Sequence, residues 1–545
     1  MIILGLNRLE GFTGEFFRDE SACLVKDGEV IAACAEERFT RNKHHAGFPW
    51  GTINYFFKDF DLSLEDIDYV ATSWPRQDRR PKSESKLPFK LPVEKIETVG
   101  VGHELSHASS TYRSSGWKKS LILSMDAMGI DYFKNRKVLS SGGVFIGKGG
   151  DINPINFFPL QASMGMFYGI VTSAIGFLFG DGEGKTMGLA GYGNANLAYK
   201  GLKKIAPCVE GLKLKPKKNL AKWVTWNYNN AYRVLPEIGY VSMLVERHGR
   251  RNVAAAAQRI LEEVISELVQ NMVDEFGLKK ICLAGGVFLN VKVNKRVLEL
   301  ENIKDIFIYP NPGDGGACVG AALEAYNNLH GKKKNGELRD VYLGPEYSNR
   351  EIEGLLKRKD FEYEHVGDIP EKVAELISKG KVVGWFQGRM EWGPRALGAR
   401  SVVADSTDPK VKDRINRVLK KRYWFMPFAP SILAKAVGEY FVDPYPSPFM
   451  ILAFDVKEKK QKEIPAVMHI DGTARPHTVE RKVNPKYYEL IKCFEDICGV
   501  PIILNTSFNL HGLPIILDPS DALWHLERKA IDVLAIGDYF VKRKR

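Results

Sequence analysis

Short apolar runs alternate with amphipathic segments along the first part of the 545-residue chain. Residues 2–6, 121–125 and 280–284 are apolar runs of strand length. Between the last two runs, apolar residues recur at helical spacing over 257–272, which predicts a long helix. An Asp-Gly pair at 27–28 separates two further β-like runs and predicts a hairpin. Strands that alternate with helices predict an α/β fold with ligands at the strand ends.

The pattern is interrupted near residues 329–349, where the sequence is polar and basic. After this stretch, apolar residues at 373–377 have helical spacing, and 382–386 is typical of a buried strand. A chain of this length is expected to form several compact cores. We therefore expect one domain over residues 1–340 and a second over residues 350–545.

Composition places the chain among globular proteins, with 44% hydrophobic and 26% charged residues. No apolar stretch is long enough to span a bilayer, and the first residues do not have the pattern of a secretory signal. The seven cysteines are scattered and include no CxxC pair, which favours a reducing compartment. We therefore expect a cytoplasmic protein with no membrane partner.

Basic residues outnumber acidic residues by 78 to 66, and the formal net charge is +12. This excess favours an anionic partner, either the phosphates of a small substrate or a nucleic acid. A lysine-rich proteome would produce the same excess, so charge alone does not choose between these interpretations.

The segment HELSH at 103–107 has the spacing of a zinc metalloprotease motif. Two histidines one helical turn apart can share a metal, and the glutamate between them can activate water. With a third ligand at Asp126, where an apolar run ends, His103 and His107 would leave open positions for iron or zinc chemistry. No further ligand of the protease pattern follows, and two polar helix residues would also produce this spacing.

Four glycine-rich segments share one property. Glycine allows the backbone to approach a phosphate, and free N–H groups can then bind its oxygens. A single loop of this kind would be an ordinary turn, but the set predicts a phosphate or nucleotide site. The segments are MDAMG (125–129), GDGEGKTMGLAGYG (180–193), LAGGVFLN (283–290) and NPGDGGACVGAA (311–322).

Basic residues of the second half stand among glycines and aromatic residues rather than among acids. Arginine suits bidentate phosphate binding, and lysine acts as a point charge. A solvated basic face would have polar neighbours, whereas apolar residues flank these segments on both sides. The residues are Arg389, Arg395, Arg400, Lys420, Lys421 and Arg422.

Taken together, these segments resemble the carbamoyltransferases of the nodulation, aminoglycoside and cephamycin type. The resemblance rests on AEERFTR, HELSHA, GDGEGKTMGLAGYG, GGVFLN, NPGDGGA, GPRALGARS, PFAPS and ILNTSFN, which run in order to about Asn509. It implies an actin-like ATPase (ASKHA) fold for the first domain, as in threonylcarbamoyl transferases. It implies an α/β carbamoyl-adenylate-forming (YrdC-like) fold for the second domain.

The resemblance also implies a two-step reaction. The second domain would make carbamoyl adenylate from carbamoyl phosphate and ATP, with Mg2+, and the first would transfer the carbamoyl group to an acceptor hydroxyl. The metal site of the family maps onto His103, His107, Asp126 and Asp314, and implies Fe2+ or another divalent metal. In this interpretation Glu104 is a bystander.

Further ligand residues follow from the same resemblance. Nucleotide binding is expected at Lys185, Gly285, Gly286 and Asn290. Carbamoyl phosphate and ATP are expected at Arg395, Arg400, Arg422, Arg475, Asn505 and Ser507.

One departure concerns the catalytic base. The family has a His-Asp pair near the start, whose histidine is a candidate base for the acceptor hydroxyl. Here FFRDESACLV has Arg18 before Asp19, and arginine stays protonated. Either Asp19 or another histidine, such as His44 or His45, is the base, or the acceptor needs little activation. The expected catalytic residues are Arg18, Asp19 and Lys185.

The family carbamoylates hydroxyls of antibiotics, lipo-oligosaccharides and other small molecules, and some members act on hydroxymethylated pyrimidines in DNA. The net charge and the basic segment 76–90 favour a polyanion, so we expect 5-hydroxymethylcytosine in DNA as the acceptor. An antibiotic or sugar hydroxyl is the alternative, and ordinary aromatic packing beside surface lysines would give the same pattern. Candidate residues for stacking on a base are Trp74, Trp223, Trp226 and Tyr228.

Two other functions share part of the pattern. A tRNA threonylcarbamoyl transferase has both domain types, but GPRALGARS and NTSFN belong to enzymes that use carbamoyl phosphate. A zinc protease accounts for HELSH alone and leaves the glycine loops and the arginines unexplained. Monomer and homodimer are both compatible with the sequence.

Overall fold

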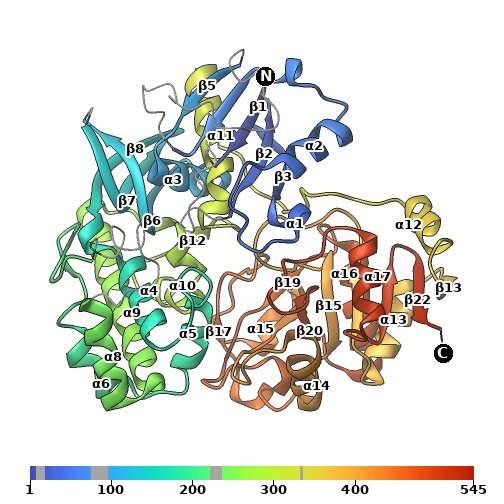
Figure 1. Cartoon of the computed structure of the whole chain (residues 1–545). Helices are drawn as coiled ribbons and strands as arrows, with labels where there is room; N and C mark the ends of the chain where they lie inside the picture. Colours follow the sequence, from blue (N-terminus) through green and yellow to red (C-terminus); the bar gives the residue numbers. More distant parts are fainter. Residues whose placement is uncertain are drawn as a thin grey trace. The chain divides into compact units, whose positions relative to one another are not determined.

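The computed structural model describes residues 1–7, 19–74, 96–134, 136–220, 222, 236–331 and 335–544. The chain forms two compact units (Figure 1). The first unit contains Met1–Glu36 and His44–Leu338, and the second contains Glu37–Lys43 and Arg339–Arg545.

The first unit contains two five-stranded sheets with the same topology. In each sheet the first three strands form an antiparallel meander, and the last two are parallel to the first strand. This repeated order is that of the actin-like ATPase fold, so the predicted fold class is confirmed. One sheet has the order β3-β2-β1-β4-β5, from Ile2–Leu6 (β1), Ser21–Lys26 (β2), Glu29–Ala35 (β3), Tyr69–Thr72 (β4) and Glu97–Gly100 (β5). The other has the order β8-β7-β6-β11-β12, from Lys119–Phe133 (β6), Arg136–Lys148 (β7), Asp151–Pro159 (β8), Lys280–Ala284 (β11) and Asp305–Ile308 (β12).

Two helices form a layer between these sheets (Figure 1). The helix α11 (Asp314–His330) packs on β1, β2 and β4, and α3 (His103–Ser114) packs on β6 and β11. The two helices also pack against each other. They therefore bring the ends of strands from both sheets close to residues of both helices.

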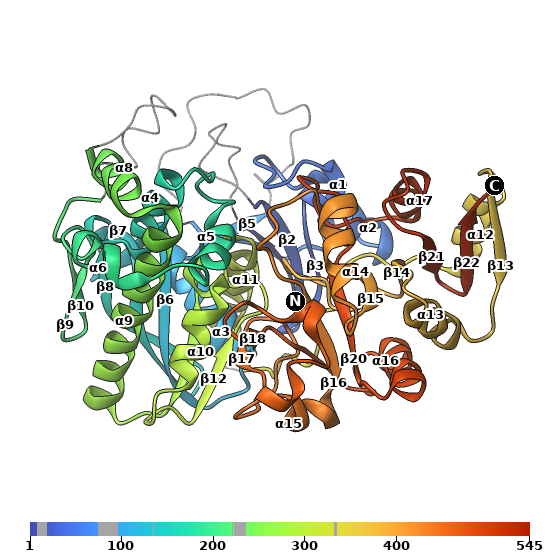
Figure 2. The ribbon, with the colours of Figure 1, turned by 90° about the horizontal axis from the view of Figure 1, so that it is seen from below.

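The predicted hairpin and long helix are both present. Asp27 and Gly28 connect β2 to β3 with φ angles of 51° and 84°, in the left-handed region that such a turn requires. The helix predicted over 257–272 lies within α9 (Arg250–Phe276), which Figure 2 shows beside the other helices of this part of the unit. Those helices are α4 (Met164–Ala174), α5 (Glu183–Ala190), α6 (Ala195–Leu202), α8 (Pro236–His248) and α10 (Val291–Leu298).

The second unit is built on one mixed sheet of eight strands, in the order β13-β22-β21-β14-β15-β20-β16-β19. The helices α13 (Ile369–Ser378) and α16 (Pro485–Cys498) pack together, and α16 also packs on β16 and β20. The strands are Phe361–His365 (β13), Val383–Phe386 (β14), Arg400–Asp405 (β15), Ala429–Leu433 (β16), His477–Val479 (β19), Ile502–Ser507 (β20), Val533–Ile536 (β21) and Tyr539–Arg543 (β22). Other helices are α12 (Asn349–Leu356), α14 (Pro409–Ile415), α15 (Val437–Tyr440) and α17 (Pro519–Glu527).

A short segment from the first half of the chain belongs to the second unit. Residues 37–43 include α1 (Glu37–Thr40) and carry two arginines that bond to the second half. Arg38 donates to the carbonyl of Gly393 at 3.0 Å. Arg41 donates to the carbonyl of Ile515 at 2.8 Å and forms an ion pair with Asp521 at 3.3 Å. The domain boundary expected from the sequence near residues 340–350 does not predict that residues 37–43 belong to the second unit.

None of the helices in the described part of the chain combines the length and apolar character needed to cross a membrane.

Candidate active site

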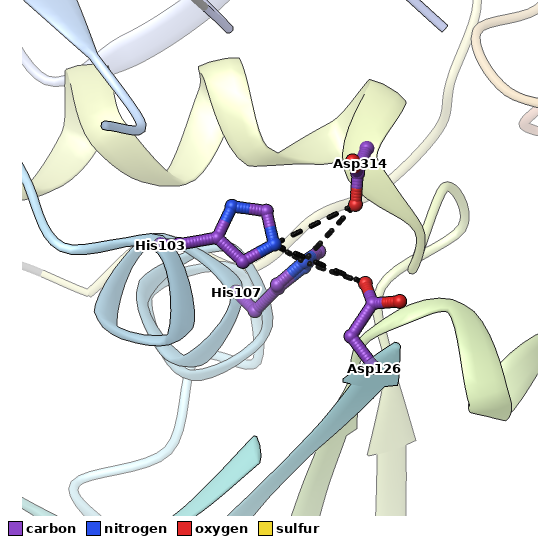
Figure 3. A group of neighbouring side chains, drawn as sticks. All are labelled: His103, His107, Asp126 and Asp314. Carbon is purple, nitrogen blue, oxygen red and sulfur yellow. Dashed lines mark hydrogen bonds and ion pairs between the residues drawn. The ribbon is translucent and has the colours of Figure 1, made fainter. Parts of the chain in front are cut away.

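Four side chains of the first unit face one another (Figure 3). His103 and His107 lie one turn apart on α3, and Asp314 is the first residue of α11. Asp126 lies in β6 where pairing with β7 is interrupted after Met125, and such irregularities re-aim side chains. One ligand atom from each of the four side chains lies within 4.8 Å of the others.

The spacing of these atoms matches a metal site. Nε2 of His107 lies 3.2 Å from Oδ2 of Asp126 and 3.7 Å from Oδ1 of Asp314. Nε2 of His103 lies 3.6 Å from Oδ1 of Asp314 and 3.2 Å from Nε2 of His107. Donor atoms about 2.1 Å from a tetrahedral ion lie about 3.4 Å apart. The four side chains therefore fit one divalent ion, and imidazole with carboxylate suits both iron and zinc.

The electrostatics of the cluster also favour a cation. Burial lowers the pKa of His107, but contact with Asp126 and Asp314 more than offsets burial and raises the pKa to about 10. Burial, and next the nearby Asp314 carboxylate, raise the pKa of Asp126. Two carboxylates in a buried site need positive charge, which a divalent ion supplies while the histidines bind it in neutral form.

Hydrogen bonds from three backbone N–H groups hold the ligands in place. The helix α3 begins after Gly102, which has no side chain to cap it, and Asp131 of β6 takes that role. Its carboxylate accepts the N–H of Glu104 at 3.1 Å and the N–H of Leu105 at 3.3 Å. The N–H of Gly286 donates to Oδ2 of Asp126 at 3.2 Å.

Glu104 does not act as the glutamate of a metalloprotease would. It is fully buried, and neither of its carboxylate oxygens accepts a hydrogen bond from another described residue. Burial raises its pKa well above the usual range for a glutamate. Asp126 and Asp314 complete the cluster instead, so HELSH contributes its two histidines to the site.

Three of the predicted nucleotide residues have different surroundings. Lys185 on α5 pairs with Asp181 at 2.8 Å. Gly286 supports Asp126 through its N–H, as described above. Gly285 has a φ of 98°, and a Cβ there would lie 2.2 Å from the carbonyl oxygen of Met125, so only glycine fits. These glycines allow close approach of two backbones.

The side chain of Asn290 forms hydrogen bonds with other residues of the protein. Its Oδ1 accepts the N–H groups of Lys292 and Val293, both at 3.2 Å, and thereby caps α10. Its Nδ2 donates to Oε1 of Gln258 at 2.9 Å. In the structure Asn290 caps α10 and pairs with Gln258, and its contact with nucleotide stays a prediction.

The predicted catalytic residues Arg18 and Asp19 lie on either side of a boundary of the described residues. Arg18 lies outside the described residues. Asp19 is described, and its Oδ1 lies 2.7 Å from Nδ1 of His44. Nε2 of His44 in turn lies 3.2 Å from Oδ1 of Asp181.

Four cations cluster in the second unit. Burial lowers the pKa of Arg395 and of Arg422 to about 10. The pKa values of Arg475 and Lys420 fall well below their usual range, mainly through burial and then through repulsion by neighbouring cations. Among the described residues, no carboxylate pairs with any of the four. Buried cations without counter-charge destabilise a protein unless an anion binds, so this group is a candidate anion site.

Lys420 belongs to this group, and the sequence named it together with Lys421 among the candidate phosphate-binding residues. Only 4% of it is exposed. Its Nζ donates to the carbonyl oxygen of Ser507 at 2.6 Å and to Oδ1 of Asn509 at 2.8 Å. The sequence shows Lys420 beside Lys421, which is exposed, and contains no signal that distinguishes the two.

Arg400 differs from the expectation of a phosphate ligand. It is fully buried, and its guanidinium lies 3.6 Å from the ring centroid of Phe386. All three of its nitrogen atoms donate to backbone carbonyls, which leaves it holding chain segments together. These carbonyls belong to Pro345, Gln387, Gly388, Ala399 and Leu517.

Asn505 retains a polar atom with no partner. Its Nδ2 donates to the carbonyl of Ala396 and to Oγ of Ser431, both at 3.0 Å. Its Oδ1 is buried and accepts no hydrogen bond from a described residue. A ligand with an N–H group would satisfy this oxygen.

Three of the four aromatic residues expected to stack on a nucleic-acid base lie outside the described residues. They are Trp223, Trp226 and Tyr228, and the basic segment 76–90 also lies outside the described residues. Trp74 is described, and its ring packs against His103 with centroids 5.5 Å apart. In this position Trp74 lies against one of the four residues of the candidate metal site.

A repeated actin-like unit with a metal-competent cluster, followed by a unit with a buried anion site, is the layout of an enzyme that handles phosphorylated substrates. The model of the carbamoyltransferase N-terminus matches residues 8–90 and 90–323, and the model of the C-terminus matches 374–543. The chain belongs to the carbamoyltransferase family and is a transferase enzyme.

Similar proteins agree with this assignment. The chain is 35% identical to nodulation protein NolNO of Sinorhizobium fredii, over 97% of this chain and 79% of that protein. It is 34% identical to nodulation protein NolO of Bradyrhizobium diazoefficiens, over 82% and 79% of the respective chains. It is 36% identical to the uncharacterized protein MJ1058 of Methanocaldococcus jannaschii, over 93% and 83%. Among solved structures, HypF of T. kodakarensis aligns with 61% of this chain and 48% of its own at 16% identity, with a TM-score of 0.35 that supports no inference.

Proposed function

We propose that the chain is an ATP-dependent O-carbamoyltransferase that works in two steps. Residues 350–545 make carbamoyl adenylate from carbamoyl phosphate and ATP with Mg2+, and residues 1–340 transfer the carbamoyl group to a hydroxyl. The observation that carries the proposal is the cluster of one buried and three partly buried cations in the second unit, which has no carboxylate partner among the described residues. Both proposed substrates are polyanions that such a cluster would bind.

Within the second unit, each group has a distinct role in this proposal. Arg395, Arg422, Arg475 and Lys420 neutralise the phosphates, and this charge balance favours transfer between phosphates. The unpartnered Oδ1 of Asn505 accepts an N–H of the carbamoyl amide. Ser507, which already contacts Lys420, positions that lysine.

Within the first unit, His103, His107, Asp126 and Asp314 would hold Fe2+ or another divalent ion. When bound, the ion supplies a Lewis acid that polarises the carbamoyl carbonyl. Trp74 packs against His103, and both histidines of α3 are buried. Gly285 and Gly286 allow the nucleotide to approach the backbone, and Lys185 supplies a positive charge near it.

For the acceptor, we propose the hydroxymethyl group of 5-hydroxymethylcytosine in DNA. The support is the net charge of +12 together with the basic segment 76–90, which favour a polyanion as the acceptor. A hydroxyl of an antibiotic or sugar is the competing acceptor, and the same assay distinguishes the two.

The test is a mass-spectrometric assay of the acceptor. The full chain is incubated with ATP, carbamoyl phosphate, Mg2+ and Fe2+, together with unmodified, hydroxymethylcytosine or hydroxymethyluracil DNA. The expected product is one carbamoyl group on hydroxymethylcytosine, lost in His107→Ala and unchanged in the matched surface variant His330→Ala. Parallel reactions contain an aminoglycoside or a simple sugar instead of DNA.

Each outcome has a separate meaning. Carbamoylation of the sugar or antibiotic alone would retain the chemistry and exclude DNA. Carbamoyl phosphate that is not consumed with ATP under any condition would exclude the two-step reaction itself.

A further inference from the structure

A chain of polar side chains in the first unit lies outside the metal cluster. Nδ1 of His44 lies 2.7 Å from Oδ1 of Asp19, and its Nε2 lies 3.2 Å from Oδ1 of Asp181. Oδ2 of Asp181 accepts from Nζ of Lys185 at 2.8 Å. The His44 side chain is 20% exposed, so solvent or a ligand can reach it.

The backbone is held in an unusual shape to bring the first two of these residues together. Asp19 has a φ of 67° and His44 has a φ of 58°, both in the left-handed region. Non-glycine residues in this region are uncommon and cluster at functional sites. The N–H of Glu20 also donates to the carbonyl of His45 at 3.2 Å, which ties the two segments together.

The same pair is anchored to the helix that begins with Asp314. Nδ2 of Asn7 donates to the carbonyl of Asp19 at 2.9 Å. Oδ1 of Asn7 accepts the N–H of Cys318, in the first turns of α11, at 3.1 Å. Asn7 follows β1 directly, so His44 is fixed relative to the strand end and the helix that present the metal cluster.

We propose that His44 is the general base that accepts the proton of the acceptor hydroxyl. This role rests on the proposed function. The hydroxyl oxygen forms a bond to the carbamoyl carbon of carbamoyl adenylate, and the bond from that carbon to the phosphate oxygen breaks. AMP leaves with the electron pair, Nε2 of His44 takes the hydroxyl proton, and the proton is then released to solvent.

The neighbours of His44 suit this role. Asp19, at the shorter distance, fixes Nδ1 as the N–H donor and directs Nε2 towards the loop before α5. The contact between Nε2 and the Asp181 carboxylate places a proton on Nε2, so His44 becomes a base once that proton is lost, and Lys185 then remains as the partner of Asp181. Glu183 is also in electrostatic contact with His44.

The test separates the two half-reactions and needs no identified acceptor. Carbamoyl phosphate-dependent exchange of pyrophosphate into ATP reports formation of the adenylate. Release of AMP with water as the acceptor reports transfer. The variant is His44→Gly, because glycine adopts the left-handed backbone of this position without strain. His330→Ala, an exposed histidine at the end of α11, is the matched control.

The expected result for His44→Gly is unchanged exchange with AMP release reduced about 100-fold, the usual effect of losing a general base. Added imidazole should restore at least a tenth of the rate. The rise of the wild-type rate with pH should disappear in the variant. Asp19→Asn should give a smaller loss, because asparagine also tolerates this backbone but orients the ring less well.

Unchanged AMP release in His44→Gly would overturn the role of His44. So would a loss that imidazole does not restore and that leaves the pH profile intact, because His44 would then only support the structure. Absence of exchange in the unaltered protein would overturn the proposed function, and this role with it.

Discussion

At the scale of single residues, His525 shows how burial fixes a protonation state. Its Nδ1 donates to the carbonyl of Asp521 at 2.7 Å, and its Nε2 accepts the N–H of Leu510 at 3.1 Å. A proton on Nε2 of His525 would point at the N–H of Leu510 and repel it. Burial, and then the nearby cations, lower the pKa of His525 to about 4.

This shift predicts a loss of stability in mild acid. The folded pKa lies below the unfolded value of about 6.5, so the unfolded chain binds the extra proton between these two values. Stability is therefore full above about pH 6.5 and is lost as the pH falls towards 4. From pH 7 to pH 5 this residue should cost about 2 kcal/mol. Urea unfolding at both pH values should show that loss reduced by the same amount in His525→Gln, but not in His365→Gln, whose side chain is exposed.

Arg475 illustrates a residue kept for binding at the expense of stability. It is crowded by Arg395 and Arg422 and has no carboxylate partner among the described residues. Arg475→Gln should raise the free energy of unfolding by about 1 kcal/mol, because it removes a repelled cation. The same variant should lower affinity for carbamoyl phosphate about 100-fold. Denaturant unfolding and calorimetric titration measure the two effects, and a variant that loses both stability and binding would contradict this account.

At the scale of elements, the position of α3 depends on Asp131 in a neighbouring strand. Asp131→Ala would leave the N–H groups of Glu104 and Leu105 unsatisfied and should cost about 2 kcal/mol of stability. The helix that carries His103 and His107 would also move more freely, so affinity for Zn2+ or Fe2+ should fall about 10-fold or more.

Asp131→Asn is the graded control, since its amide oxygen still accepts one of these bonds. The shift of the thermal midpoint on adding metal reports affinity without any activity assay. Equal shifts in the alanine variant and the unaltered protein would show that α3 does not need this cap to present its histidines.

Most predictions of helices and strands rested on hydrophobic periodicity and local motifs. The hairpin at 27–28 and the helix around 257–272 depend on short-range chemistry that one sequence displays directly. The HELSH spacing likewise marks two histidines that the structure sets beside Asp126 and Asp314. Burial and partners distant in the chain are not visible in this way. In the sequence, Arg400 cannot be distinguished from the neighbouring arginines, although in the structure it donates to the carbonyls of Pro345 and Leu517. Lys420 likewise cannot be distinguished from Lys421 in the sequence.

At the scale of the whole molecule, the division into units does not follow the order of the chain. Arg41 belongs to the second unit, where it bonds to Pro514, Ile515 and Asp521. Arg41→Ala should therefore destabilise the second unit by about 2 kcal/mol, because it removes charged hydrogen bonds that are partly buried. Hydrogen exchange measured along the chain should show faster exchange in α17 and its neighbours than in β6. Faster exchange confined to residues 1–340 would contradict the assignment of residues 37–43.

The assignment of residues 37–43 to the second unit also has a consequence for folding during synthesis. During synthesis, residues 37–43 leave the ribosome well before their partners at Gly393 and at 514–521. The early segment must therefore stay available until these later residues have been made. Such a late contact between distant parts of a chain is slow to form. A chain that stops before residue 514 therefore lacks contacts that residues 37–43 need within the second unit.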